Sequence, residues 1–328
     1  MWRRQGTPKD GFTYTRVDGS PLRSAAALKR IRALAIPPAW TDVEIDPDPA
    51  AKVQATGIDA KGRKQYRYHP DTVAKGSRRK FRKLAEFARA LPRLREVTAE
   101  HLKQPGVGRE RVLATTVRLI IRGFFRVGSE RYAVDNKTFG ITTLQKKHLR
   151  ISGTTLDFTY VGKKSIHQHN VIADTPLVEI LREIMELPGK RLFRYRDEDG
   201  TVRDVSARDV NDYIQSIVGK KFTSKDIRTW GGTVRAATIL ADLGPPQSEA
   251  EGKRNVLLAC KLVSTELGNT PAVCRSAYIH PAVLDRYLTG KTIAPLMREE
   301  PRQGDAEAPL TYYPEEAALM RFLEKSKK

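Results

Sequence analysis

Cysteine is scarce in this sequence, and so are the usual features of nucleotide- or metal-dependent enzymes. The two cysteines, Cys260 and Cys274, are too few for a disulfide framework and lack the spacing of metal ligands. Such sparing use of cysteine is typical of the reducing cytosol. No phosphate-binding glycine loop and no Asp/Glu cluster suited to Mg²⁺ is visible. These absences argue against an ATP-driven or metal-dependent nuclease, and we expect no cofactor.

Long apolar runs are missing as well. No stretch approaches the ~18 apolar residues that a membrane-spanning helix requires. The N-terminal Met-Trp-Arg-Arg-Gln-Gly is not followed by an apolar run, so no signal peptide is visible. His167 and His169 alternate on an expected strand, but no third ligand with suitable spacing accompanies them. We therefore expect a cytoplasmic protein with neither a membrane anchor nor a metal site.

Acidic residues are strongly outnumbered by basic ones. The chain has 59 Lys and Arg against 38 Asp and Glu, which gives a formal net charge of +21. Basic side chains release counterions from a phosphate backbone when they bind it. A surplus this large favours a polyanionic partner over a merely soluble basic protein. The length of 328 residues is sufficient for two domains with a real core.

The first part of the chain has the pattern of a small β-rich domain. One helix is expected over residues 24–34, where apolar side chains recur at helical spacing. Alternating patterns predict strands over residues 12–17, 43–45, 53–58 and 64–68. Between Lys61 and Lys83 we count ten Lys/Arg and a single acid. Residues 74–77 lack apolar periodicity, so we place a linker there and divide the chain into domains 1–77 and 78–328.

The second domain is predicted to be mainly α-helical with one small three-stranded sheet, so the chain as a whole is of the α+β class. The sheet is expected from residues 148–151, 155–161 and 165–173. Helical spacing and capping residues predict helices over residues 81–90, 94–102, 112–125, 175–187, 206–218, 224–243, 249–267, 282–288 and 314–325. After Pro295 the composition becomes acidic and contains several prolines.

The predicted strand at residues 64–68 has the composition of a nucleic-acid contact. Alternation places Arg63, Gln65 and Arg67 on one face and the two tyrosines on the other. Aromatic rings between cations can lie against sugars or bases while the cations hold phosphates. The alternative is a solvated edge strand whose tyrosines belong to the core. The candidate contacts are Arg63, Gln65, Tyr66, Arg67 and Tyr68.

Four separated blocks contain residues that could act together on a phosphate. They are Arg126 after an apolar helix, Lys163 in the turn near Gly162, Arg228 in Lys225-Asp-Ile-Arg-Thr-Trp-Gly231, and Tyr278 in Gly268-Asn-Thr-Pro-Ala-Val-Cys-Arg-Ser-Ala-Tyr278. Each block by itself has an ordinary structural interpretation. Gly268 ends a helix, Asn269 or Thr270 caps the next, and Tyr278 would be a half-buried core residue.

In this order and spacing, over roughly residues 60–290, the four blocks resemble the type IB DNA topoisomerases. The resemblance is greatest to the short poxvirus-like branch and to its bacterial members. A similar Arg-x-Gln-Tyr-x-Tyr stretch touches DNA in that family. Tyrosine recombinases share the catalytic constellation and remain an alternative, as does a non-catalytic basic DNA-binding protein.

The resemblance implies a role for each residue. Tyr278 is the nucleophile that forms a 3′-phosphotyrosyl bond, Arg126 and Arg228 hold the non-bridging oxygens, and Lys163 protonates the leaving oxygen. Asn269 stands where the family often has histidine. Tyr132 and Lys225 complete the candidate DNA contacts, and Lys225 is also the next candidate for the acid.

It also implies the overall activity. The expected protein is a monomer near the nucleoid whose two domains clamp duplex DNA. It would relax supercoils by cleaving, rotating and rejoining one strand, with neither nucleotide nor metal.

Overall fold

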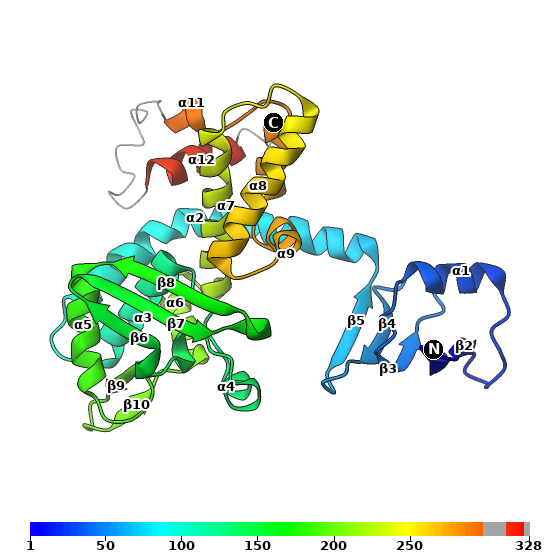
Figure 1. The fold of residues 1–328 in the computed structure, drawn as a ribbon, viewed down its shortest axis with the longest axis horizontal. Coiled ribbons are helices and arrows are strands. Elements are labelled where there is room, and N and C mark those ends of the chain that lie inside the picture. The colour runs from blue at the N-terminus through cyan, green and yellow to red at the C-terminus, as the bar shows by residue number, and fades with distance from the viewer. Residues whose placement is uncertain (298–312, 325–328) are drawn as a thin grey trace. The chain divides into compact units, whose positions relative to one another are not determined.

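The computed structural model describes residues 1–297 and 313–324, and the chain divides into two compact units, Met1–Arg82 and Lys83–Lys328. Figure 1 shows the strands of the first unit in blue and the helices and small sheets of the second in cyan to red. The predicted α+β class is confirmed, with a small β-rich first unit and a mainly helical second one.

The first unit is a five-stranded antiparallel sheet with the order β2-β1-β3-β4-β5. Its strands are β1 (Trp2–Thr7), β2 (Gly11–Thr15), β3 (Thr41–Ile45), β4 (Val53–Ile58) and β5 (Lys64–Tyr68). The sequence did not predict β1, because its segment after Trp2 is polar and exposed and shows no apolar alternation. Pairing with both β2 and β3 holds this segment extended.

One helix covers one face of this sheet. Helix α1 (Ala25–Ala33) begins where the hydroxyl of Ser24 accepts a hydrogen bond from Ala27 N at 3.3 Å. Its buried Ile31 joins Val43 and Ile45 of β3 in the core of the unit. The opposite face of the sheet is not covered by α1, which leaves its side chains available for contacts outside the unit.

The residues predicted as a linker, 74–77, lie inside a single helix, α2 (Pro70–Leu102). Gly76 costs such a helix only ~1 kcal/mol relative to alanine, which its neighbours can offset. The helix also continues past Pro92, where the sequence indicated a break, and Leu91 and Leu94 are both buried there. The two units divide inside α2, between Arg82 and Lys83.

The second unit contains two small antiparallel sheets among its helices. The predicted sheet is β6 (Leu149–Ser152), β7 (Thr155–Val161) and β8 (His167–Ala173), in that order. A second sheet, in addition to the predicted one, pairs β9 (Arg194–Arg196) with β10 (Val202–Asp204). Three residues per strand are too few for a periodic signal.

The helices of the second unit agree in most places with the predicted ones. Those that carry or support the site are α3 (Arg109–Gly123), α4 (Glu130–Asn136), α7 (Ser224–Asp242), α8 (Glu249–Leu267), α9 (Pro271–Ala277), α10 (Pro281–Tyr287) and α12 (Pro314–Glu324). The others are α5 (Thr175–Glu186), α6 (Ala207–Val218) and α11 (Ala294–Met297). Most of the acidic segment predicted after Pro295 lies outside the described residues.

Helix α3 forms the centre of the second unit. Val112, Leu113, Val117 and Ile120 are fully buried along it. It packs against α5, α6 and α7 and against β8 and β9. Because α3 is packed by so many elements, the loop that follows it begins at a fixed position.

Candidate active site

The loop that carries Arg126 is fixed by its backbone. Helix α3 ends at Phe124, which adopts a left-handed conformation with φ of 52°. Arg126 O then accepts a hydrogen bond from Ile141 N at 2.7 Å. Gly140 is needed beside this loop, since a Cβ there would lie 2.7 Å from Arg126 O. The Arg126 side chain therefore leaves from a rigid base.

The guanidinium of Arg126 reaches the chain between α8 and α9. Its Nη2 donates to Gly268 O at 2.6 Å and to Asn269 Oδ1 at 2.7 Å. Gly268 ends α8 with φ of 60°, and a Cβ there would lie 2.3 Å from Oε1 of Gln168 on β8. The left-handed backbone at this position favours glycine. The structure thus brings together two of the predicted catalytic residues, Arg126 and Asn269.

Arg228 meets the same segment from helix α7. The helix begins with a capping box between Thr223 and Asp226, which places Arg228 in its second turn. Arg228 is 4% exposed, and its Nη2 donates to Leu267 O at 2.8 Å. Burial, and then the nearby Arg126 charge, lower the pKa of Arg228 to about 10. A pKa of that size still leaves the guanidinium charged at neutral pH.

Two buried donors in this site have no partner within the described residues. They are Nε of Arg228 and Nδ2 of Asn269. A buried donor without a partner costs about 1–3 kcal/mol. An anionic oxygen bound between the two side chains could satisfy both donors, as expected of a phosphate site.

Tyr278 stands at the end of the short helix α9. Thr270 caps the start of that helix by accepting a hydrogen bond from Val273 N at 3.4 Å. The tyrosine is half-buried, and Cζ of Arg228 lies 5.5 Å from its ring centre. Its carbonyl accepts a hydrogen bond from Thr233 Oγ1 on α7 at 3.2 Å. The predicted nucleophile and the buried arginine are therefore neighbours.

Lys163 is placed differently from the other four residues. It opens a short 3₁₀ turn, η3 (Lys163–Ser165), at the tip of the β7–β8 hairpin (Figure 1), and it is exposed. Lys164 and Ser165 beside it have positive φ values of 63° and 57°. Within the described residues Lys163 makes no hydrogen bond or ion pair. Its position in the hairpin turn agrees with the sequence prediction, and its side chain is not held by other described residues.

Sequence reasoning missed residues that support the site. Tyr160 on β7 is 6% exposed and close enough to both arginines that their charges lower its pKa, although burial dominates and raises it to about 12. Gly232 lets Tyr278 approach α7, because a Cβ at Gly232 would lie 3.0 Å from Tyr278 O. The Gly231-Gly232 pair inside a helical pattern was a usable signal. Nothing in the sequence singled out Tyr160.

Two further predicted contacts lie on the surface of the second unit. Tyr132 on α4 is 42% exposed, and Lys225 is exposed in the first turn of α7. Lys225 is separated from Arg228 by less than one helical turn. Both positions are accessible to a large partner.

In the first unit, Tyr66 and Tyr68 face solvent, so the alternative of two core tyrosines is wrong. Their exposed fractions are 45% and 49%, and their rings stack with centres 5.9 Å apart. They lie on β5, an edge strand of the sheet. Exposed aromatic pairs of this kind suit contact with a flat or extended partner.

The other three residues of this predicted contact set are engaged within the first unit. Arg63 Nη2 pairs with Asp59 Oδ2 at 2.6 Å, and Gln65 Nε2 donates to the same oxygen at 3.0 Å. Arg67 donates to Ala35 O. These contacts hold the ends of β5 and reduce the freedom of the side chains to reach a ligand.

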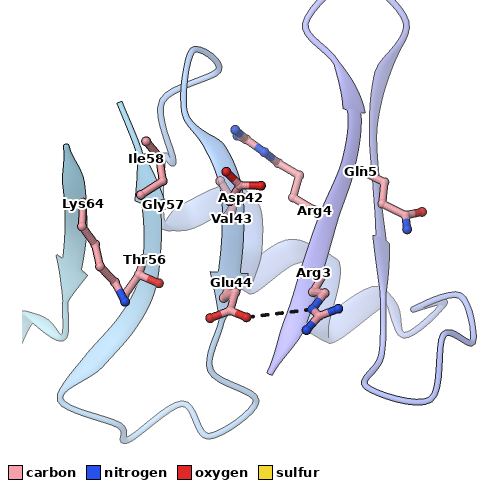
Figure 2. A pocket seen from close by; sticks show the side chains of 10 residues that line it. All are labelled: Arg3, Arg4, Gln5, Asp42, Val43, Glu44, Thr56, Gly57, Ile58 and Lys64. Atoms are coloured by element: carbon pink, nitrogen blue, oxygen red, sulfur yellow. Dashed lines mark ion pairs between the residues drawn. The ribbon is translucent and has the colours of Figure 1, made fainter. Parts of the chain in front are cut away.

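A shallow hollow of about 470 Å³ adjoins these residues on the sheet (Figure 2). Strand pairing places Arg3, Glu44, Thr56 and Tyr66 side by side on the same face. Arg3 and Glu44 form an ion pair at 3.9 Å. Lys64 lies on the same face of β5 as Tyr66. It lines the hollow and is exposed.

Neither a metal cluster nor a membrane-spanning helix is found in the described part of the chain. Over residues 1–297 and 313–324, no three His, Cys, Asp or Glu side chains come together as metal ligands. No helix in the same ranges is long and apolar enough to cross a membrane. His167 and His169 are exposed, and His169 pairs with Asp157 at 3.0 Å.

Comparisons with known proteins identify the family of this chain. A family model described as the catalytic core of eukaryotic DNA topoisomerase I matches residues 69–299, and one for the N-terminal domain of bacterial DNA topoisomerase IB matches residues 11–59. DNA topoisomerase 1B of Acanthamoeba polyphaga mimivirus is 33% identical over 285 residues, covering 85% of each chain. The vaccinia virus (strain Copenhagen) enzyme is 23% identical over 290 residues, covering 84% of this chain and 88% of its own.

This chain belongs to the type IB DNA topoisomerase family. The membership identifies an enzyme that relaxes DNA by the type IB mechanism, and it does not favour a recombinase or a non-catalytic binding protein. The second family model also agrees with the bacterial branch of the short, poxvirus-like enzymes. The roles of individual residues are a separate question.

Proposed function

We propose that the topoisomerase cleaves one strand of duplex DNA by attack of the Tyr278 hydroxyl on a phosphodiester. The observation that carries the assignment is the meeting of Arg126 and Arg228 at the segment Leu267–Asn269, with Arg228 beside the Tyr278 ring. Two guanidiniums at one place bind a phosphoryl group and stay charged throughout the reaction.

Cleavage and rejoining each break one bond to phosphorus and form another. The Tyr278 hydroxyl gives up its proton to water as its oxygen bonds to phosphorus, the bond from phosphorus to the 5′-oxygen breaks, and that oxygen takes a proton from the protein. The 3′-phosphotyrosyl bond keeps the energy of the broken linkage, so rejoining needs no ATP. While the bond persists, the free 5′ end rotates about the intact strand and relieves supercoils of either sign.

Arg126 and Arg228 stabilise the charge that develops on the non-bridging oxygens. The buried Arg228 Nε and Asn269 Nδ2 point to where that charge is received, because each is a donor with no partner among the described residues. Asn269 donates without carrying a charge, which distinguishes it from the histidine common in the family. Hydrogen bonds to Leu267 O and from Arg126 already hold the Arg228 and Asn269 side chains before DNA is bound, so little reorganisation is required in the transition state.

Lys163 supplies the proton for the departing 5′-oxygen. An alkoxide is a poor leaving group, and a positioned acid adds roughly 10²–10⁴-fold to such a step. The exposed tip of the hairpin lets the side chain enter a DNA groove. Lys225 is the alternative acid, being exposed and on the helix of Arg228.

Duplex DNA is bound by both units of a monomer, in the cytoplasm at the nucleoid, without nucleotide or metal. The net charge of +21 supports a phosphate-rich partner. In the first unit, Lys64, Tyr66 and Tyr68 are the exposed members of β5. Tyr132 and Lys225 extend the contact in the second unit. Arg63, Gln65 and Arg67 support the strand through their contacts within the unit.

Tyr278→Phe tests the assignment directly. The variant should form no covalent DNA adduct when a cleavage reaction in EDTA is stopped with detergent, while its affinity for DNA stays near wild type. Tyr195→Phe, which removes a hydroxyl from β9, is the matched control and should form adduct normally. An adduct in the Tyr278→Phe reaction would exclude Tyr278, and a strict need for Mg²⁺ or ATP would exclude the mechanism.

The salt dependence of binding tests the DNA contact of the first unit. Each phosphate contact adds a slope of about −0.9 to log K against log salt. Lys64→Ala should make the slope shallower by up to about one unit, because Lys64 is exposed. Arg63→Ala should change it less, because Arg63 is paired with Asp59. Equal slopes for wild type and Lys64→Ala would remove Lys64 from the phosphate contacts.

A further inference from the structure

The C-terminal helix α12 lies beyond the region matched by the family model, yet it carries a deeply buried acid. The matched region ends at residue 299, and α12 begins at Pro314. Glu316 in its first turn is 4% exposed. Burying a carboxylate is costly unless its oxygens are paired. The partners of Glu316 therefore reveal what the helix holds.

Both carboxylate oxygens of Glu316 are engaged. Arg95 of α2 donates from Nη1 to Oε2 at 2.6 Å and from Nη2 to Oε1 at 2.9 Å. The indole Nε1 of Trp230 donates to Oε1 at 2.9 Å, and Tyr313 N donates to Oε2 at 3.2 Å. Bidentate pairing with arginine fixes the plane of the carboxylate as well as its position. Glu316 thus joins α12 to α2 and α7 at one point.

The attachment point on α7 lies next to the catalytic arginine. Trp230 is 2% exposed and follows Arg228 by two residues. Two residues correspond to roughly 200° of rotation around a helix, so the two side chains leave α7 on opposite sides. Glu316 therefore holds α7 from the side away from the arginine that faces Tyr278.

Apolar packing between α12 and α7 is incomplete at this point. An open hollow of about 310 Å³ has Ile227, Trp230 and Val234 of α7 on one side and Glu315 and Glu316 of α12 on the other. Side chains that line a gap forgo part of their dispersion contacts. At this gap the polar contacts of Glu316 bridge the two helices, while Leu319 and Phe322 are buried further along α12.

Helix α12 also contacts the segment that follows the nucleophile. Arg286 of α10 lies with its Cζ 3.9 Å from the ring centre of Phe322 and donates to Phe322 O. Helix α10 begins three residues after Tyr278. Helix α12 thus contacts both α7, which carries Arg228, and α10, which follows Tyr278.

We propose that Glu316 is a positioning residue for DNA cleavage, and that α12 is part of the catalytic scaffold. Through Trp230 it keeps α7 in the place where Arg228 meets the phosphoryl group. This inference rests on the proposed role of Arg228. Small displacements of such a group cost large factors in rate, so loosening α12 should slow chemistry while leaving DNA binding intact.

Glu316→Gln in the full chain is the decisive variant. It keeps the size of the side chain but turns one acceptor oxygen into a donor that faces the donors of Arg95 or Trp230. We expect single-turnover cleavage to be slower by about 10-fold, with an unchanged dissociation constant for DNA. Glu315→Gln removes the same charge from the same turn, where the described residues offer it no hydrogen bond or ion pair, and should cleave at the wild-type rate.

A double-mutant cycle with Arg228→Ala separates positioning from general stability. If Glu316 acts through Arg228, Glu316→Gln slows the Arg228→Ala enzyme much less than it slows wild type. Equal slowing in both backgrounds overturns the proposal, and so does a wild-type rate for folded Glu316→Gln. If that variant does not fold, Trp230→Phe removes only the indole N–H and is tested in the same cycle. Failure of the proposed function would differ, because Tyr278→Phe would then still form adduct or Arg228→Ala alone would cleave at the wild-type rate.

Discussion

The two arginines and the lysine of the candidate site differ in how the protein holds them. Arg228 is 4% exposed and Arg126 is half-buried, and each guanidinium donates to main-chain carbonyls of the segment Leu267–Asn269. Lys163 is exposed on a hairpin tip and makes no such contact within the described residues. The two arginines are therefore already held in place in the free protein, whereas the Lys163 side chain is not held by other residues.

This difference matches the two kinds of work that phosphoryl transfer requires. Charge stabilisation is most effective when the donors are fixed beforehand and shielded from water. A proton donor has to reach an oxygen that belongs to the DNA, so its final position is set only when DNA is bound. We infer that the two arginines are preorganised and that the lysine is placed by the substrate.

Replacing the buried arginine should have the largest effect. Arg228→Ala should slow single-turnover cleavage by roughly 10²–10³-fold or more, the usual cost of one transition-state donor. Arg228→Lys should also be slow, because an ammonium cannot offer the planar fork of a guanidinium. Circular dichroism would establish that each variant is folded.

Arg235→Ala is the matched control for this experiment. Arg235 lies on the same helix but is half-exposed and paired with Glu266 at 2.7 Å. Its removal should leave the cleavage rate near wild type. If folded Arg228→Ala cleaved as fast as Arg235→Ala, Arg228 would have no catalytic role.

Asn269→His should have the smallest effect near neutral pH. A neutral imidazole can accept the hydrogen bond that Arg126 now gives to Asn269 Oδ1 at 2.7 Å. Below about pH 6.5, the ordinary pKa of imidazole, a protonated ring loses that acceptor and repels Arg126. The cleavage rate of the variant should therefore fall with decreasing pH more steeply than that of wild type. Complete loss of cleavage at all pH values, with folding intact, would show that the site requires an amide.

Sequence patterns predicted the elements of the site better than their connections. The helix of Arg228, the cap at Thr270 and the hairpin of Lys163 all follow from local signals, namely helical spacing, capping residues and a turn glycine. Local signals do not fix which elements meet in space. The closeness of Arg126, Asn269, Arg228 and Tyr278 was expected only from the family resemblance.

The misses have physical causes as well. The basic run near residues 74–77 was interpreted as a linker because it lacks apolar periodicity, although solvated helices need none. Strand β1 is held by its two neighbours instead of by its own pattern. Tyr160 gained its importance from tertiary contacts with residues distant in the sequence. Such features depend on the assembled fold, so a single sequence does not reveal them.

The most direct test of the division between fixed charges and a delivered proton uses DNA with sulfur in place of the bridging 5′-oxygen. A thiol, with a pKa of about 8.5, leaves without protonation, whereas an alkoxide does not. Lys163→Ala should cleave ordinary DNA roughly 10²–10⁴-fold more slowly than wild type. It should cleave the sulfur-bridged DNA at nearly the wild-type rate. Arg126→Ala and Arg228→Ala should be rescued much less. Equal slowing of Lys163→Ala on both DNAs would contradict this account, and Lys225 would then be the next candidate for the acid.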